Sequence, residues 1–193
     1  MRLFVAVELD EAVRAAAARA ADDLRQQVRR TGLDARWVVF DNLHLTLVFI
    51  GQIEDRSADS FAAALGQPFA QRPFRLRLGR CGVFPPSGPP RVIWIGLADG
   101  AEALRHLQQE VVRRLQPLGF EPERRPFSAH LTIARVKDVR HAGARAARAM
   151  ITGLSAPDAS CLITRVTLFR SHLSPKGSRY EVMAHGELAG SSA

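Results

Sequence analysis

The sequence contains two nearly identical tetrapeptides, and their placement constrains the fold more than any other feature. They are His44-Leu45-Thr46-Leu47 and His130-Leu131-Thr132-Ile133, which begin 86 residues apart. Each lies in an apolar stretch typical of a β-strand, and each follows a helix and a loop. Because the same pattern recurs in matching contexts, we expect two similar lobes, each built around one motif strand.

Hydrophobic periodicity predicts alternating strands and helices along the rest of the chain. Asp10 can cap a helix through about Arg30, which Thr31-Gly32 would end. This order predicts a mixed α/β or α+β domain over residues 1–188, followed by a frayed tail at 189–193. We expect strands over 3–9, 36–40, 44–50, 74–83, 91–97, 127–136, 161–169 and 179–188, and further helices over 57–65, 99–115 and 139–150.

Basic residues outnumber acidic ones by 27 to 19, which gives a net charge of +8. Such a balance favours anionic partners, including phosphates. All but two of the basic residues are arginine, a skew that either genomic composition bias or bidentate phosphate binding can produce. Seven basic residues and one acid, Asp138, lie from Arg124 to Arg148, around the second motif. We expect this stretch to attract a polyanion.

Several protein classes are excluded by what the sequence lacks. Its two cysteines, Cys81 and Cys161, are too few for a disulfide framework or a cysteine-rich metal site, and we expect a reduced pair. The sequence has no apolar run of 18 residues, no signal-peptide core and no glycine-rich phosphate loop. We therefore expect a soluble, cytoplasmic protein without a membrane partner.

The histidine and threonine of each motif have a spacing suited to phosphate chemistry. In a strand, residues i and i+2 point to the same face, so His44 with Thr46, and His130 with Thr132, would share a face. One neutral imidazole can take a proton from an attacking oxygen while a protonated one donates to the leaving oxygen. The threonine hydroxyls can hydrogen-bond the other phosphate oxygens. Neither motif carries further metal ligands, so we expect no metal and no cofactor.

Other conspicuous residues receive more ordinary interpretations. Arg135 follows His130 by five positions, so in a regular strand it points to the opposite face, and only a bulge or bend would bring it to the phosphate. Trp37, Trp94 and Phe49 lie among apolar strand residues and are expected in the core. Surface or structural roles are expected for the remaining histidines, which are His106, His141, His172 and His185.

The paired motifs resemble those of the 2H phosphoesterases. Within them the chain is most similar to the RNA 2′,3′-cyclic phosphodiesterase family, whose members were also described as bacterial 2′-5′ RNA ligases. One departure is Ala129, where relatives commonly carry proline before the second histidine; alanine could loosen the start of that strand. The resemblance covers nearly the whole chain and is carried by residues 2–7, 42–51, 82–85, 90–94, 125–135 and 171–180.

The resemblance implies a bilobal α+β fold, with an antiparallel sheet flanked by helices in each lobe and an active-site cleft between them. It also implies hydrolysis of RNA 2′,3′-cyclic phosphate termini to 2′-phosphates, with reverse 2′-5′ ligation as a minor activity. By this analogy His44 is the general acid and His130 the general base. Thr46 and Thr132 would bind the phosphate, with Arg135 as a weaker candidate. The partner would be RNA or a nucleotide with a cyclic phosphate, acted on by a monomer.

Two alternatives fit the same residues. The chain could be a 2H phosphoesterase for another small phosphodiester, such as a 2′-5′ oligoadenylate or a cyclic phosphate of ADP-ribose. It could also be a basic RNA-binding module whose motif histidines merely contact phosphate. Turnover of a cyclic phosphate end distinguishes the first interpretation from both alternatives.

Overall fold

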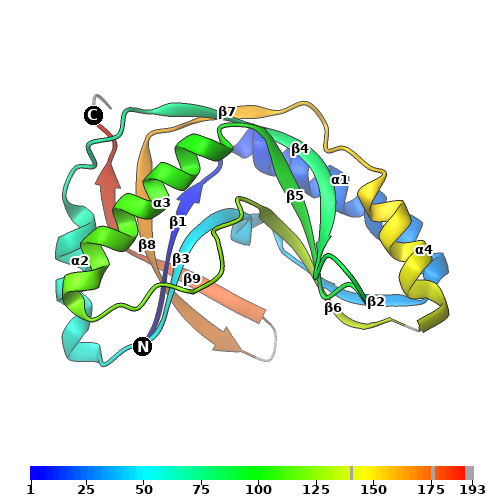
Figure 1. Cartoon of the computed structure of the whole chain (residues 1–193), viewed down its shortest axis with the longest axis horizontal. Helices are drawn as coiled ribbons and strands as arrows, with labels where there is room; N and C mark the ends of the chain where they lie inside the picture. Colours follow the sequence, from blue (N-terminus) through cyan, green and yellow to red (C-terminus); the bar gives the residue numbers. More distant parts are fainter. Residues whose placement is uncertain (140, 175–176, 190–193) are drawn as a thin grey trace.

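In the computed structural model, which describes residues 1–139, 141–174 and 177–189, the chain forms two antiparallel β-sheets (Figure 1). The first sheet has the order β3-β1-β8-β9, with bounds His44–Gln52, Arg2–Glu8, Arg165–Ser174 and Gly177–Glu187. The second has the order β2-β6-β5-β4-β7, with bounds Leu33–Trp37, Leu131–Val139, Val92–Asp99, Phe74–Phe84 and Ser160–Ile163. The predicted α+β class is confirmed, with one motif strand in each sheet.

Helices cover one face of each sheet and leave the other face uncovered, here called the helix-free face. α2 (Ala58–Gly66) and α3 (Ala101–Leu115) pack on the first sheet, whereas α1 (Glu11–Val28) and α4 (His141–Thr152) pack on the second. In the sequence α1 follows β1, a strand of the first sheet, but it packs on the second sheet. One continuous hydrophobic core joins the two sheets. No helix in the described ranges is long and apolar enough to cross a membrane.

The first helix begins and ends where its sequence predicts. The Asp10 carboxylate accepts a hydrogen bond of 2.8 Å from the amide of Val13, which satisfies one of the free N–H groups at the helix start. A 3₁₀ turn over Arg29–Thr31 follows the helix, and Gly32 ends it with a left-handed φ of 73°. The apolar stripe of the helix is buried as expected.

Three predicted strands have different bounds in the structure. The single strand expected over 161–169 is wrong: β7 belongs to the second sheet and β8 to the first, and the chain crosses between them at Thr164. A continuous apolar run does not reveal this crossing, because both parts are buried in the shared core. The strand expected over 36–40 lies three residues earlier, as β2, and the one expected from 127 begins four residues later, at Leu131.

The expected frayed tail is partly anchored. The amide of Ala189 donates hydrogen bonds to the carbonyls of Phe69 and Gln71, both at 3.0 Å. Residues 190–193, the rest of that tail, lie outside the described residues.

Each motif strand contains a β-bulge at the fourth residue of its motif. Leu47 is the extra residue of β3 against β1, and Ile133 is the extra residue of β6 against β5. The bulged residue and its successor are both buried in each strand: Leu47 with Val48, and Ile133 with Ala134. A bulge of one residue reverses the alternation of side chains that follow it. The next side chains on the helix-free face are therefore Phe49 in β3 and Arg135 in β6, one residue later than in a regular strand.

The helix-free face of the second sheet has a close contact between Gly82 and Trp94, which are paired across β4 and β5. A Cβ atom at position 82 would overlap the indole ring of Trp94. The glycine therefore leaves the space in which the indole lies flat against the sheet.

We predict that Gly82→Ala destabilises the protein because the added methyl group must displace the Trp94 ring. Overpacking of this kind costs about 1–3 kcal/mol, which should lower the melting temperature by several degrees. A matched control is Gly66→Ala at the end of α2, where the new Cβ would meet its nearest atom at 3.9 Å. Thermal unfolding followed by circular dichroism measures both, and equal melting temperatures for the two variants would contradict the predicted clash.

Candidate active site

The first motif places His44 and Thr46 on the helix-free face of the first sheet, with Leu45 in the core as predicted. His44 Nδ1 lies 2.8 Å from the carbonyl oxygen of Asn42. Because a carbonyl can only accept, Nδ1 carries the proton and donates it. Nε2 lies 3.0 Å from the hydroxyl oxygen of Thr46, so the neutral ring accepts a hydrogen bond there.

The second motif holds its histidine in the same way. His130 Nδ1 donates to the carbonyl of Ser128, again two residues earlier, at 2.7 Å. In both neutral rings Nε2 is therefore the unprotonated nitrogen, which can take part in proton transfer. Thr132 is paired with Trp94 across β6 and β5, on the helix-free face of the second sheet. The structure thus gives the two motif histidines equivalent tautomers, one on each sheet.

Aromatic rings fix the orientation of both imidazoles. His44 lies between Phe4, at a centroid distance of 4.9 Å, and Tyr180, whose ring meets it edge-on at 5.3 Å. His130 packs edge-on against Phe84 at 5.0 Å. Such packing restricts the rotamers of both histidines, which is what catalytic groups need.

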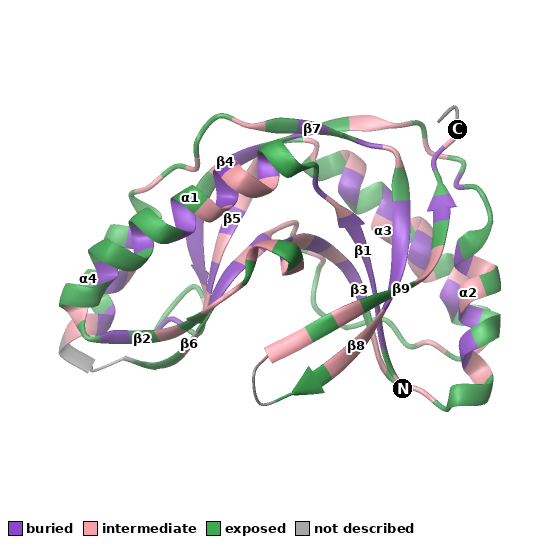
Figure 2. Ribbon diagram, turned by 180° about the vertical axis from the view of Figure 1, so that it is seen from behind, coloured by how far each residue is buried: buried purple, intermediate pink, exposed green. Residues whose placement is uncertain are grey.

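Tyr180 reaches His44 because the β8–β9 hairpin is bonded to the loop before the first motif. The side-chain amide of Asn42 donates to the carbonyl of Ser178 at 2.8 Å. β8 pairs with β1 only over part of its length. Beyond that part, β8 and β9 pair only with each other within the described chain. Figure 2 shows this end of the hairpin as intermediate to exposed. Sequence reasoning missed Asn42 and Tyr180, since their contacts span 136 residues or more.

Arg135 lies on the same face as Thr132, because the bulge at Ile133 reverses the alternation. The prediction that Arg135 points to the face opposite His130 is therefore wrong, because the strand contains the bulge that was named as the exception. Arg135 is exposed and forms no ion pair with a carboxylate among the described residues. Its positive charge adds a small lowering of the pKa of both His44 and His130, beside the larger effect of burial.

Both motif histidines favour the neutral form in the free protein. Burial lowers the pKa of His44 from 6.5 to about 4, against the opposing effects of the Asn42 hydrogen bond and the Glu8 carboxylate. Burial also lowers the pKa of His130, and its hydrogen bond to Ser128 offsets part of that effect. Desolvation disfavours the imidazolium in each case.

Glu8 is directly opposite His44 in the β1–β3 pairing. Its carboxylate accepts a hydrogen bond of 2.8 Å from the buried hydroxyl of Thr167 and lies 3.5 Å from the Arg165 guanidinium. His185 Nδ1 is 3.0 Å from the same hydroxyl. This network orients a negative charge beside His44, where it favours the protonated ring.

Phe49 and Trp94 are not core residues, contrary to expectation. The bulge at Leu47 brings Phe49 to the helix-free face, where its ring is 6.2 Å from Phe4 and its side chain is 50% exposed. Trp94 lies beside His130, with ring centroids 6.4 Å apart. Trp37 does pack against the core, as predicted.

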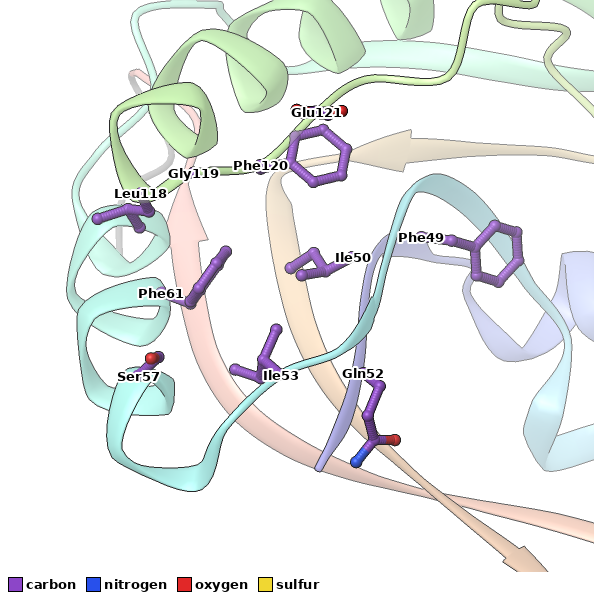
Figure 3. Close-up of a pocket in the computed structure, with 10 residues that line it drawn as sticks. All are labelled: Phe49, Ile50, Gln52, Ile53, Ser57, Phe61, Leu118, Gly119, Phe120 and Glu121. Atoms are coloured by element: carbon purple, nitrogen blue, oxygen red, sulfur yellow. The ribbon is translucent and has the colours of Figure 1, made fainter.

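A shallow pocket of about 430 Å³ lies outside β3, near α2 and the turn after α3. Its lining is mixed, with Ile50, Ile53 and Phe61 facing one another (Figure 3) and Gln52, Ser57 and Glu121 as polar members. Phe49 stands at its rim and points away from these residues (Figure 3). No motif residue lines this pocket, and of the residues placed at the histidine site only Phe49 borders it.

Three basic residues of the stretch around the second motif differ in their contacts. Arg148 donates to the carbonyls of Pro85 and Pro86, each at 3.0 Å, and so supports the proline-rich loop. Lys137 lies 3.6 Å from Asp34. Of these three residues, Arg135 lies on the same face as Thr132.

The remaining candidates have local roles. His172 lies 2.7 Å from Glu181 and His106 lies 3.8 Å from Glu102, while the side chain of His141 is outside the described part. Cys81 and Cys161 are buried free thiols, as predicted. Within the described ranges, no three histidine, cysteine, aspartate or glutamate side chains gather as metal ligands.

Each of the two sheets carries one motif strand, as the resemblance to the 2H phosphoesterases implies. Residues 10–175 match the model of the 2′-5′ RNA ligase superfamily. The chain belongs to this family.

Curated relatives named RNA 2′,3′-cyclic phosphodiesterase include proteins of Aeropyrum pernix and Thermus thermophilus. The former is 38% identical over 118 residues, which cover 61% of this chain and 66% of the relative. The latter is 35% identical over 199 residues, covering 98% and 91%.

Solved structures with the same fold include one from Thermus thermophilus, with a TM-score of 0.77 and 29% identity over all of both chains. Escherichia coli LigT in complex with 3′-AMP has a TM-score of 0.72 and 24% identity, over 97% of this chain and 98% of that one. At that identity, the likeness to LigT shows the fold alone.

We predict that kcat/KM for a cyclic phosphate substrate is greatest below pH 6.5. Catalysis by this pair requires one charged and one neutral imidazole, and kcat/KM reports the pKa values of the free enzyme. Because both pKa values are lowered from 6.5, both rings lose their protons as the pH rises toward 6.5, and the rate should fall. A profile that is flat from about pH 5 to about pH 8 would contradict two-histidine catalysis.

Glu8→Gln provides the matched variant for this profile. Removing the carboxylate removes an interaction that raises the pKa of His44. The limb of the profile governed by His44 should therefore move to lower pH, while the limb governed by His130 stays in place.

Proposed function

We propose that this protein hydrolyses 2′,3′-cyclic phosphate ends of RNA to 2′-phosphates through its two motif histidines. The observation that carries the proposal is the matched placement of the two motif histidines, each of which donates Nδ1–H to a carbonyl two residues earlier and leaves Nε2 unprotonated. Arg135 lies on the same face as Thr132, and a guanidinium is suited to an anionic phosphorus centre. The names of the curated relatives support RNA 2′,3′-cyclic phosphate as the substrate.

In the proposed reaction, water attacks phosphorus in line with the bond to O3′. His130, neutral, takes a proton from the water as the new P–O bond forms. His44, protonated, donates its proton to O3′ as the P–O3′ bond breaks, so the phosphate remains on O2′. Family resemblance assigns the two roles, and the Glu8 carboxylate opposite His44 supports them because it favours the charged form of the acid.

The threonines and Arg135 act on the other phosphate oxygens. In the free protein the Thr46 hydroxyl donates to His44 Nε2. Once His44 is protonated, that nitrogen becomes a donor, and the Thr46 hydroxyl is released to donate to a phosphate oxygen. Thr132 is placed to do the same from the second sheet, and Arg135 stabilises the charge that builds in the transition state.

Phe49 is suited to bind the base of the terminal nucleotide. It is half exposed on the face that carries His44 and Thr46. Stacking of a base on an aromatic side chain contributes about 1–3 kcal/mol without regard to sequence. We infer that Phe49 positions the terminal nucleotide while the motifs hold its phosphate.

With a 5′-hydroxyl in place of water, the same arrangement would join RNA ends. The 5′ oxygen would form a bond to phosphorus and give its proton to the neutral histidine, while the P–O3′ bond breaks and O3′ takes a proton from the charged histidine, which leaves a 2′-5′ linkage. This reaction is a minor activity in our proposal, because water is far more concentrated than RNA ends.

The direct test is a short RNA with a 2′,3′-cyclic phosphate end, incubated with the protein in EDTA and followed by phosphorus NMR. We expect a 2′-phosphate product. His44→Ala and His130→Ala should each lower kcat by at least about 10²–10⁴-fold, the usual contribution of one proton transfer. His106→Ala on α3 is the control, since that exposed ring is far from the site and pairs only with Glu102 in the described chain.

A 3′-phosphate product would overturn the proposed direction of ring opening, and turnover that needs a metal would overturn metal independence. Absence of turnover with RNA still bound would favour the binding module. Turnover of a 2′-5′ oligoadenylate or an ADP-ribose cyclic phosphate instead of RNA would favour the alternative phosphodiester enzyme.

We predict that Phe49→Ala raises KM for a cyclic phosphate RNA by about tenfold, as expected for the loss of one stacked base. Phe49→Tyr keeps the aromatic face and should stay close to the parent protein. Leu162→Ala removes a similarly exposed apolar side chain, 53% accessible, from β7 and is the control. An unchanged KM for Phe49→Ala would rule out the stacking role.

A further inference from the structure

Arg36 and Arg135 lie directly opposite each other on β2 and β6. Their neighbours Trp37 and Ala134, also paired, pack in or against the core. Because side chains alternate, both arginines lie on the helix-free face of the second sheet. Both are exposed.

Two like charges directly opposite in a sheet destabilise it unless something neutralises them. Within the described residues, neither arginine forms an ion pair with a carboxylate. Asp34, two residues before Arg36, lies instead 3.6 Å from Lys137. The pair is therefore open to an external anion, and the guanidinium group matches a phosphate better than any other cationic side chain.

The two arginines do not occupy equivalent places relative to the histidines. The charge of Arg135 reaches both His44 and His130, whereas Arg36 is not among the charges that shift either pKa. β2 is also the edge strand, on the side of β6 away from β5 and Trp94. The backbone of Arg36 thus lies about one strand spacing, roughly 4.8 Å, beyond that of Arg135 on the side away from Trp94.

We propose that Arg36 binds the phosphodiester on the 5′ side of the terminal nucleotide while Arg135 contacts the cyclic phosphate. The proposal rests on the proposed function and narrows its substrate class, from any nucleotide with a cyclic phosphate to an oligonucleotide. A mononucleotide has no internal phosphodiester and cannot use Arg36.

The experiment compares adenosine 2′,3′-cyclic phosphate with the dinucleotide ApA that ends in a 2′,3′-cyclic phosphate. For the parent protein, kcat/KM should be higher for the dinucleotide. Arg36→Ala should lower kcat/KM for the dinucleotide by about fivefold to tenfold, the size of one exposed charge-assisted contact, and leave the mononucleotide unchanged. Arg36→Lys should recover part of the loss, since it keeps the charge but not the fork.

Arg19→Ala is the matched control, because Arg19 is exposed on α1, on the helix-covered side. Its kcat/KM should equal that of the parent for both substrates. Raising the salt concentration should weaken the dinucleotide preference in the parent and not in Arg36→Ala, a response that a folding defect would not produce.

An equal loss on both substrates would overturn the proposal, since Arg36 would then act on the cyclic phosphate or on folding. No loss on either would overturn it as well. If the parent turns over neither substrate, the proposed function fails, and calorimetry with adenosine 2′-phosphate and ApA 2′-phosphate still decides the subsite. If ApA 2′-phosphate binds more tightly than adenosine 2′-phosphate and this difference depends on Arg36, the Arg36 subsite is supported. Equal binding of the two ligands overturns the subsite.

Discussion

The site depends on one extra residue in each motif strand. Leu47 and Ile133 are bulged at the same place in the two motifs, and both point into the core with the residue that follows. A shift of one residue turns every later side chain to the other face of a sheet. The bulges therefore bring Phe49 and Arg135, each five residues after its histidine, to the face that carries the histidine. Regular strands would have buried both.

The symmetry of the two motif strands extends only to their backbone. Both histidines donate Nδ1–H to a carbonyl two residues earlier. The residue five positions after the histidine, however, is aromatic in one strand (Phe49) and cationic in the other (Arg135). One strand is thus suited to contact a base and the other a phosphate. Similar backbones carry different side chains, and together they match the two parts of a nucleotide.

Burial of the histidines sets the conditions under which the site becomes active. Each imidazole is packed against aromatic rings, and this desolvation keeps both neutral in the free protein. A general acid must nevertheless be protonated. Glu8 favours that form at His44, and an anionic phosphate beside the ring favours it further. In this account the substrate itself provides much of the charge that prepares the acid.

The sequence predicts the parts of the structure that depend on local patterns. The alternation in each motif places His44 and His130 correctly, and the Asp10 cap and Gly32 locate the ends of α1. Alternation cannot reveal a bulge, because two adjacent buried residues also occur in regular buried strands. For that reason the sequence alone does not predict on which face of the sheet the side chains of Phe49 and Arg135 lie.

Contacts between distant segments were also beyond sequence reasoning. An apolar run over 161–169 indicates one strand even though the chain changes sheets at Thr164. The Asn42–Ser178 hydrogen bond and the packing of Tyr180 on His44 depend on where the hairpin folds back. No local pattern encodes that position.

The most direct test of the central claim is a crystal structure with a nucleoside 2′-monophosphate, the product of the proposed reaction. We expect its phosphate to lie within hydrogen-bonding distance of Nε2 of both His44 and His130 and of the Arg135 guanidinium, with the base stacked on Phe49. A phosphate bound to one motif only, with Arg135 turned away from it, would contradict the claim that the two bulged strands form one site.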